Sequence, residues 1–293
     1  MKLLLTLLTS SDLPRLKRLV GSVLNLNSVK DIELKVIIVL NTLNEEYAKE
    51  VFSANLPFII VRTKSDGKPG KGKNSCLDLF LKTDFDFISQ IDGDDFLYPT
   101  YLESLHNHIS HFPCIDVLGV IPIDYISNGK AAGHTFNIHN GSEVGVWGCS
   151  VVSPSKESGP GLSHVWKEEL PPSSDFIILQ SKKSAIIKMH EDIPVGEDHL
   201  YTYQLLAEHQ KGNLCYFQTM SSDLYVIDRN TESSIQDQYP QKDYVEQLRN
   251  LSLNYVNKDR SSPRELPIMY KELLLNQYEK EDFIKKITEE YAE

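Results

Sequence analysis

Two patterns of hydrophobic and polar positions alternate along the first half of the chain. Apolar runs bounded by polar turns predict buried strands at Leu3–Thr9, Leu34–Leu40, Phe58–Val61, Phe87–Ile91 and Ile115–Ile123. Between these runs, apolar residues at helical spacing predict helices at Pro14–Leu26, Glu45–Phe52, Ser75–Leu81 and Pro99–Phe112. This order predicts an α/β fold with a mostly parallel central sheet flanked by helices. In such sheets, ligands bind beyond the carboxyl ends of the strands.

The apolar run at the N-terminus resembles a secretory signal only superficially. Leu3–Thr9 is short, no small-x-small cleavage site follows it, and Ser11, Asp12 and Pro14 are typical of a helix start. We therefore interpret the run as the first buried strand. Because no stretch approaches the ~18 apolar residues of a membrane span, no transmembrane segment is expected.

The pattern changes in the second half of the chain. Asn128–Ser174 has no clear periodicity, and we expect long loops and short strands that shape a pocket. Regular structure is expected again at Asp175–Leu179, near Lys183–Met189 (helix), at His199–His209 (helix), and at Leu214–Gln218 and Leu224–Ile227 (strands). The tail from Tyr244 to Glu293 is predicted to be helical, with an apolar stripe of Phe283, Ile284, Ile287 and Tyr291.

Charge and cysteine content exclude several classes of protein. The 293 residues include 30 Lys and Arg against 41 Asp and Glu, which gives a formal net charge of −11 at pH 7. This balance argues against a nucleic-acid partner, since duplex binding depends on basic side chains. The four cysteines are far apart and form no C-x-x-C pair, so a zinc ribbon or disulfide scaffold is not expected. A reducing compartment, the cytoplasm, is the expected location.

An acidic cluster follows the fourth predicted strand. Asp92, Asp94 and Asp95 surround Gly93, and three carboxylates so close together repel one another unless a cation or an unusual environment compensates. Hard oxygen ligands of this kind suit Mg²⁺ or Mn²⁺. A turn that caps the next helix is the alternative interpretation. A calcium EF-hand is excluded, because apolar side chains occupy positions where an oxygen ligand and the turn glycine are needed.

A stretch rich in glycine and lysine lies between the third strand and the next helix. Gly67 to Asn74 nearly matches the phosphate-binding pattern G-x-x-x-x-G-K-[ST]. Asn74 replaces the hydroxyl that binds magnesium, and Pro69 removes one backbone amide from the cradle. The alternatives are a solvated lysine-rich loop and a mobile anion-binding rim beside the acidic cluster.

Two adjacent acids, Glu197 and Asp198, precede an amphipathic segment. Acids at this position usually stabilise a helix N-terminus, and a carboxylate that faces a pocket can also act as a general base. Trp147 is a candidate for stacking on a sugar ring, although a Trp is more often simply packed. Three histidines, His106, His108 and His111, are expected on the polar face of one helix.

Taken together, the order of these motifs resembles glycosyltransferase family 2, inverting enzymes with the GT-A fold. The resemblance covers roughly residues 2 to 237. It rests on five segments: the second strand ending at Asn41, Gly70–Asn74, Ile91–Pro99 with its D-x-D-D motif, Phe176–Met189 followed by Gly196–Asp198, and Leu224–Arg229 followed by Ser234. The resemblance implies a GT-A domain over 1–242, with a nucleotide-sugar half at 1–112, an acceptor half at 113–242, and a helical extension at 243–293.

The resemblance also implies roles for individual residues. Asp94 would bind the metal, Mn²⁺ or Mg²⁺, and Asp92 would contact the ribose or the metal through water. Asp198 would deprotonate the acceptor hydroxyl, while Glu197 would support the helix end or contact the acceptor. The further nucleotide-sugar contacts expected are Thr9, Asn41, Arg62, Lys73, Asn74, Gly93, Arg229 and Ser234, the last two closing over the diphosphate.

The favoured function is therefore a metal-dependent hexosyltransferase that uses a nucleotide sugar, UDP-linked by preference, and a carbohydrate or other hydroxyl acceptor. A P-loop-like nucleotide hydrolase or kinase that uses Gly67–Asn74 is one alternative. A non-catalytic carbohydrate-binding relic on the same fold is another. The apolar residues of the C-terminal helices can pack on the core, form a homodimer or contact a partner.

Overall fold

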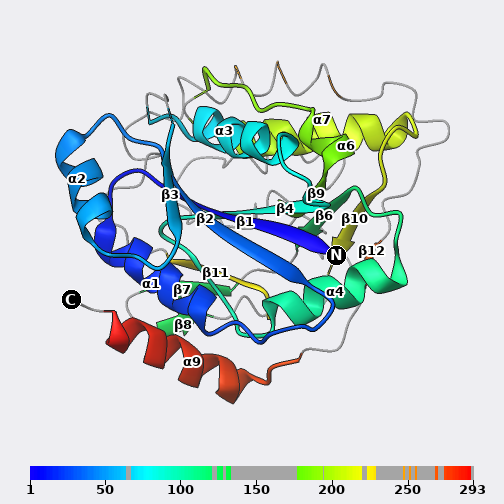
Figure 1. Ribbon diagram of the computed structural model, residues 1–293. Coiled ribbons are helices and arrows are strands. Elements are labelled where there is room, and N and C mark those ends of the chain that lie inside the picture. Colours follow the sequence, from blue (N-terminus) through cyan, green and yellow to red (C-terminus); the bar gives the residue numbers. More distant parts are fainter. Residues whose placement is uncertain are drawn as a thin grey trace, which may run out of the picture.

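A computed structural model describes residues 1–63, 67–120, 124–127, 130–132, 177–193, 195–219, 223–228, 247, 251, 255, 268–269 and 274–291. Its centre is an eight-stranded sheet in the order β12-β10-β6-β9-β4-β1-β2-β3 (Figure 1). Only β9 runs antiparallel to its neighbours, so the predicted mostly parallel α/β fold is confirmed. The strands are β1 (Lys2–Thr9), β2 (Glu33–Leu40), β3 (Ile59–Arg62), β4 (Phe87–Asp92), β6 (Val117–Val120), β9 (Ile177–Ser181), β10 (Tyr216–Thr219) and β12 (Ile268–Met269).

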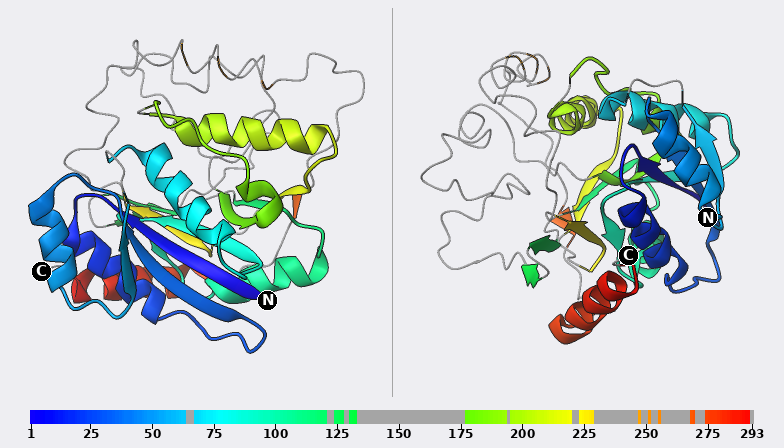
Figure 2. Two further views of the ribbon diagram at one scale, coloured as in Figure 1. Left: turned by 45° about the horizontal axis from the view of Figure 1, so that its top comes forward. Right: turned by 90° about the vertical axis from the view of Figure 1, so that its left-hand side faces the viewer.

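Helices cover both faces of this sheet (Figures 1 and 2). On one face lie α3 (Pro69–Leu81), α6 (Lys182–Ala185) and α7 (Glu197–Gln210). Against the other lie α1 (Leu13–Leu24) and α4 (Tyr101–His111), with α2 (Glu45–Ser53) beside α1 and α9 (Gln277–Glu290) packed on α1. A second sheet, in the order β5-β11-β7-β8, comprises β5 (Phe96–Leu97), β11 (Tyr225–Asp228), β7 (Asp124–Ser127) and β8 (Lys130–Ala132). No helix in these parts of the chain is long and apolar enough to cross a bilayer.

The N-terminal run is the buried strand that its pattern predicts. Along β1, Leu3, Leu5 and Leu7 belong to the core shared with α1, whereas Leu4 and Leu8 belong to the core under α3 and α7. A strand between two helical layers is apolar on both faces, which explains the continuous rather than alternating pattern.

Helix α3 begins at Pro69, so the expectation that this helix starts only at Ser75 is wrong. Proline fits the first turn of a helix because its missing N–H has no intrahelical partner there. Two glycines near its start, one of them the Gly72 of the phosphate-binding pattern, let this helix approach its neighbours. A Cβ on Gly70 would lie 2.6 Å from the backbone oxygen of His190, and one on Gly72 would overlap the Asn41 side chain.

The C-terminal tail is not wholly helical. Ile268–Met269 form β12, which pairs in parallel with β10 at the edge of the large sheet. The apolar stripe of α9 does form as predicted and packs on the core, since Ile284 and Ile287 are buried and the Phe283 ring lies 5.9 Å from that of Tyr98. Strands from both expected halves of the main domain and from the extension thus share one sheet.

Two further predictions about helices are corrected. The helix near Lys183–Met189 ends at Ala185, and the Met189 backbone is bonded to a side chain of α3 instead of to a further helical turn. His108 is buried rather than on a polar face: its Nδ1 lies 2.6 Å from the Ser104 oxygen and its Nε2 2.7 Å from Thr219 Oγ1. It therefore joins α4 to β10.

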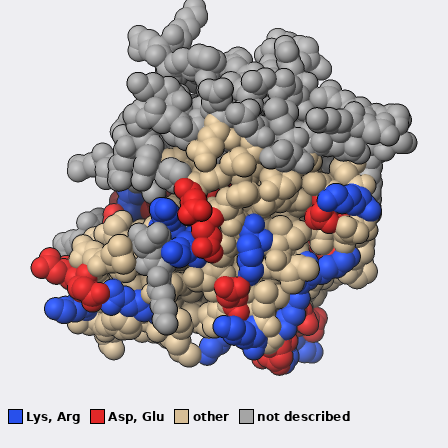
Figure 3. Space-filling model, turned by 90° about the horizontal axis from the view of Figure 1, so that it is seen from above, with Lys and Arg blue, Asp and Glu red and all other residues tan. Residues whose placement is uncertain are grey.

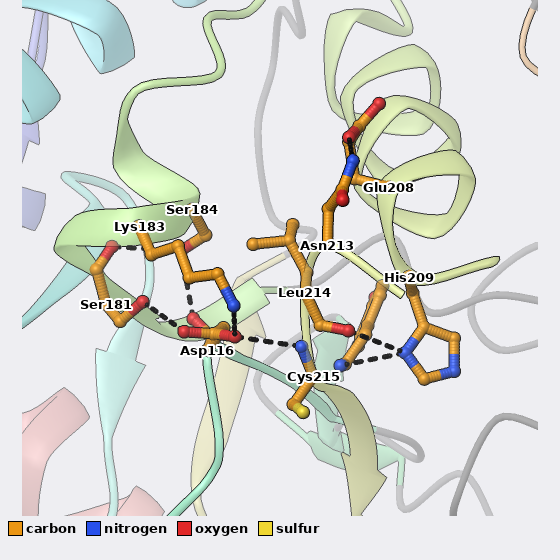
Figure 4. A network of polar contacts seen from close by, with 10 residues as sticks. Asp116, Ser181, Lys183, Ser184, Glu208, His209, Asn213, Leu214 and Cys215 are labelled. Carbon is orange, nitrogen blue, oxygen red and sulfur yellow. Dashed lines mark hydrogen bonds and ion pairs between the residues drawn. The ribbon is translucent and has the colours of Figure 1, made fainter. Parts of the chain in front are cut away.

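One buried acid ties three elements together at the amino-terminal end of β6, opposite the ligand-binding edge (Figure 4). Asp116 accepts hydrogen bonds from Ser181 Oγ at 2.9 Å and from the Cys215 N–H at 2.9 Å, and Lys183 Nζ lies 3.2 Å away. Because all these partners belong to the protein, Asp116 has a structural role.

Candidate active site

A cleft opens at the carboxyl end of β4, where the sequence pattern places the ligand. It encloses about 50 Å³ of water-sized space and is lined by side chains of α3, β4, β9, α7 and β11. The polar residues of its lining are Lys73, Gln90, Asp92, Gln180, Asp198, Tyr201 and Tyr225. Three residues predicted from separate motifs, Lys73, Asp92 and Asp198, therefore face one cleft.

The acidic turn begins where β4 ends. Gly93 is required there, because a Cβ would lie 2.7 Å from the backbone oxygen of Leu8. The Asp94 side chain is about half exposed (47%), and the Arg15 guanidinium lies 3.8 Å from its carboxylate. Partial burial of this group and the neighbouring Asp92 charge raise the pKa of Asp94 above its usual value. A cation bound at Asp92 and Asp94 would relieve this repulsion.

The residues of this turn fit Mg²⁺ or Mn²⁺ in part. Asp92 and Asp94 offer hard carboxylate oxygens, the ligands that these ions prefer. The described part of the chain contains no group of three or more His, Cys, Asp or Glu residues suited to a metal. A cation held here therefore needs further oxygens from water or from a bound diphosphate, as is usual for Mg²⁺.

The third acid of the turn has a different task. Asp95 is buried and accepts hydrogen bonds from Tyr225 Oη at 2.7 Å and from the Asp228 N–H at 3.2 Å. Burial and the charges of Asp94 and Asp92 raise its pKa well above the usual value. Asp95 thus joins the acidic turn to β11.

Two arginines of α1 support this turn and were not predicted from the sequence. Arg18 is buried and contacts both the Asp94 backbone oxygen, at 2.9 Å, and the Asp228 carboxylate, at 2.5 Å. Arg15 faces Asp94 as described above. Both lie off the apolar stripe of their helix, where periodicity alone indicates solvent-facing residues, so only the packing of α1 against β5 shows their role.

Helix α7 places its two N-terminal acids in different surroundings. Gly196 precedes it with a φ of +82°, a backbone conformation that favours glycine. Asp198 lines the cleft, whereas Glu197 is only 6% exposed and faces Lys73. Burial and the Asp198 charge raise the pKa of Glu197 to about 7, although Lys73 acts in the other direction.

Lys73 connects the two acidic groups of the site. Its Nζ lies 3.5 Å from the Asp92 carboxylate and 3.5 Å from that of Glu197. Burial by itself would lower the pKa of Lys73, but Asp92, Glu197 and Asp198 together raise it above its usual value. The ammonium group therefore stays charged between the acidic turn and the N-terminus of α7.

The neighbouring Asn74 holds the segment that leads to α7. Its Nδ2 donates to the Met189 oxygen at 2.9 Å and to Glu191 Oε1 at 3.0 Å, and its Oδ1 accepts from the Met189 N–H at 2.8 Å. The contact of Gly70 with His190 reinforces this attachment. Asn74 thus positions Asp198 indirectly.

Three other predicted nucleotide-sugar contacts are bonded to protein groups. The Asn41 amide is buried, donates to the Lys68 oxygen and accepts from Thr63 Oγ1. Arg62 forms a two-pronged ion pair with Glu45 on α2, and Thr9 Oγ1 is bonded to Tyr47 Oη. Arg229, Ser234 and Trp147 lie outside the described residues.

The charged surface around the α3 and α7 face is mixed rather than of one sign. In the described part seen in Figure 3, basic and acidic side chains alternate over this face. Such a distribution differs from the continuous basic stripe typical of nucleic-acid binding.

Comparison with solved structures identifies the same fold elsewhere. The chain is similar to S. aureus TarS, with a TM-score of 0.51 and 17% sequence identity. The aligned region covers 78% of this chain but only 37% of the TarS chain. Against TarS 1–349 in complex with UDP-GlcNAc the TM-score is 0.59 at 16% identity, over 89% of this chain and 69% of that one.

The complex of TarS 1–349 with UDP gives a TM-score of 0.54 at 16% identity, over 89% and 68% of the two chains. No protein-family model matches the chain, and no curated protein sequence does. At these identities the similarity concerns the fold, and it confirms the predicted GT-A-like architecture.

Proposed function

We propose that the protein is a metal-dependent glycosyltransferase that moves a hexose from a UDP-sugar to a hydroxyl acceptor with inversion at C1. The observation that carries this proposal is the arrangement of acids in the cleft. Asp92 and Asp198 line it from β4 and α7, with Asp94 at the end of the same turn as Asp92. A fold shared with a protein that binds UDP-GlcNAc and UDP supports the choice of donor.

In the proposed mechanism, Asp94 would hold the divalent cation directly, and Asp92 would contact it through water or contact the ribose. The bound cation would neutralise negative charge on the diphosphate as it leaves. Arg15 and Arg18 fix the turn that carries these ligands, and Asp95 fixes β11 beside it. By resemblance, Arg229 and Ser234 close over the diphosphate.

Asp198 acts as the general base. Its carboxylate accepts the proton of the acceptor hydroxyl as that oxygen bonds to C1 and the bond from C1 to the diphosphate breaks. One displacement from the face opposite the leaving group inverts the anomeric centre. Glu197, next to Asp198 in the sequence, is buried and pairs with Lys73. The positive charge of Lys73 compensates the negative charges of Glu197 and Asp92.

The arrangement of α3 weighs against the phosphate-loop alternative. Gly72, the second glycine of the phosphate-binding pattern, lies inside α3, where its N–H donates to the Lys68 oxygen at 3.1 Å and a Cβ would overlap the Asn41 side chain. The pattern lysine, Lys73, faces Asp92 and Glu197 instead of a phosphate site on its own loop. We therefore do not propose a nucleotide hydrolase.

The test is release of UDP from a panel of UDP-sugars in Mn²⁺, Mg²⁺ or EDTA. We expect slow hydrolysis of one donor, its loss in EDTA and in Asp94→Ala, and a fall of about 10²- to 10⁴-fold in transfer for Asp198→Asn with UDP binding retained. Asp84→Asn, an exposed acid paired with Lys2 at the opposite end of β4, is the matched control. Hydrolysis of ATP or GTP in place of UDP-sugars would contradict the proposal, as would sugar-nucleotide binding without turnover when acceptors are supplied.

A further inference from the structure

A row of polar side chains crosses the cleft from β4 to α7. Gln90 Nε2 donates to Gln180 Oε1 at 3.3 Å, and Gln180 Nε2 donates to Tyr201 Oη at 2.7 Å. Tyr201 in turn donates to the backbone oxygen of Ile187 at 3.1 Å. All three side chains line the cleft.

The end of this row fixes the orientation of every amide in it. The Ile187 oxygen can only accept, so Tyr201 uses its one proton there and must accept from Gln180 Nε2. Gln180 therefore directs Oε1 toward Gln90, and an oxygen at that position requires Nε2 of Gln90 opposite it. The carbonyl oxygen of Gln90 is left at the free end.

That oxygen has no donor. Gln90 Oε1 is shielded from solvent and has no hydrogen-bond partner in the described part of the chain. A shielded carbonyl oxygen without a donor is unfavourable, and such groups in native proteins call for an explanation. Because Gln90 lines the cleft, a bound ligand that brings an O–H or N–H group would provide one.

The position of Gln90 on β4 indicates which part of a bound ligand its side chain would contact. Side chains two apart on a strand point to the same face, so Gln90 is the next side chain inward from Asp92. Asp198 lines the same cleft from α7. If the diphosphate lies at Asp92 and Asp94 and the base is Asp198, the transferred sugar lies between them, beside Gln90.

We infer that Gln90 Oε1 binds the transferred sugar of the donor, by accepting a hydrogen bond from one of its hydroxyl groups or from an acetamido N–H. This inference rests on the proposed function and deepens it, since it assigns a residue that selects the sugar rather than the nucleotide. The Gln90 amide is held by Gln180, which is itself held by the Tyr201 hydroxyl, and such a fixed oxygen discriminates well between sugars. A UDP-sugar that lacks the matching O–H or N–H group leaves this oxygen unpaired.

The chain offers a matched control for this residue. Gln218 on β10 is fully buried, both polar atoms of its amide lack partners among the described residues, and it is not among the side chains that line the cleft. Methionine keeps the length and approximate volume of glutamine and removes the amide. Gln218→Met therefore reports the effect of losing an unpaired buried amide anywhere in the sheet.

The experiment measures the affinity of the full chain for UDP and for a panel of UDP-sugars by calorimetry with Mn²⁺ present. We expect Gln90→Met to bind UDP within about twofold of the wild type, since UDP has no sugar, and to bind the preferred UDP-sugar about tenfold more weakly. Gln218→Met should change neither affinity. In the wild type, one deoxy or deacetamido analogue of that sugar should lose a similar factor, and in Gln90→Met the same analogue should lose nothing further.

The other possible affinities reject either the role of Gln90 alone or the proposed function as well. Equal loss of UDP and UDP-sugar affinity, or no loss of either, rejects the inference and leaves the proposed function in place. Failure of the wild type to bind any UDP-sugar rejects both. If Gln90→Met does not unfold cooperatively, Gln90→Leu replaces it, and a wild-type analogue series without any loss above twofold rejects the inference by itself.

Discussion

At the scale of single residues, the neighbouring acids Glu197 and Asp198 have different roles, one in a buried ion pair and the other in the cleft. Both belong to the first turn of α7, where the helix dipole favours negative charge. Asp198 lines the cleft, whereas Glu197 is buried against Lys73, and its pKa is raised from 4.5 to about 7. The buried acid therefore makes folding depend on pH.

The sign of this dependence follows from proton binding. Between pH 4.5 and about 7 the folded state binds a proton on Glu197 that the unfolded state has lost, so stability falls as pH rises through this window. The shift corresponds to about 3 kcal/mol. We expect Glu197→Gln to gain on the order of this amount relative to the wild type between pH 5 and pH 8, measured by urea unfolding. Exposed Glu50→Gln is the control, and an equal effect of Glu197→Gln at both pH values would count against the argument.

At the scale of elements, α3 carries the connection between the two acidic groups. Its residues Lys73 and Asn74 reach Asp92, Glu197 and the Met189 backbone, and its glycines permit the close approach that these contacts need. A helix with glycine at two positions sacrifices intrinsic helix propensity, so the close packing has to compensate.

Gly70→Ala separates these two effects. At this second position of α3, propensity alone would stabilise the helix by less than the ~1 kcal/mol of an interior position, whereas the new Cβ would lie 2.6 Å from the His190 backbone oxygen. We expect net destabilisation of about 1–3 kcal/mol in urea unfolding, together with weaker transfer activity because the segment before α7 shifts. Ser75→Ala on the same helix is the control and should stay within about 0.5 kcal/mol of the wild type. A stabilised Gly70→Ala would show that this contact is not tight in solution.

At the scale of the whole molecule, the C-terminal extension belongs to the main fold. Its strand β12 continues the central sheet, Tyr255 is bonded to His190 at 2.9 Å and to Gln204 at 3.0 Å, and α9 packs against α1. Two of these contacts reach α7 or the segment before it. The extension therefore stabilises the candidate site from outside.

The contact between α9 and α1 can be tested because the effect of Gly21→Ala on the free energy of unfolding should change sign when Tyr291 is removed. A Cβ on Gly21 would overlap the ring of Tyr291 just after α9, so Gly21→Ala should destabilise the protein despite its better helix propensity. In a Tyr291→Ala background the overlap is absent, and Gly21→Ala should then stabilise by up to about 1 kcal/mol. Urea unfolding of the four forms, with hydrogen exchange of α9, measures both values. The same sign in both backgrounds would mean that α9 does not pack on α1 as described.

The amino-acid sequence by itself determined the layout of the fold and the main acids of the site. Buried parallel strands are continuously apolar and surface helices are periodic, so local patterns predicted β1 to β4 and the helices between them. Parallel strands end at one edge, which predicted that Asp92 and Lys73 meet there. These features could be predicted because each follows from the spacing of apolar and polar residues within one strand or helix.

Tertiary structure alone decided what each polar side chain does. Glu197 and Asp198, or Asp94 and Asp95, are chemically alike and adjacent, and only the packing of distant segments makes one buried and the other accessible. The roles of Arg18, Asn74 and Gln90 likewise depend on partners from other parts of the chain. The same holds for the strand at Ile268–Met269, because two residues carry too little periodicity to predict a strand and pairing with β10 determines it.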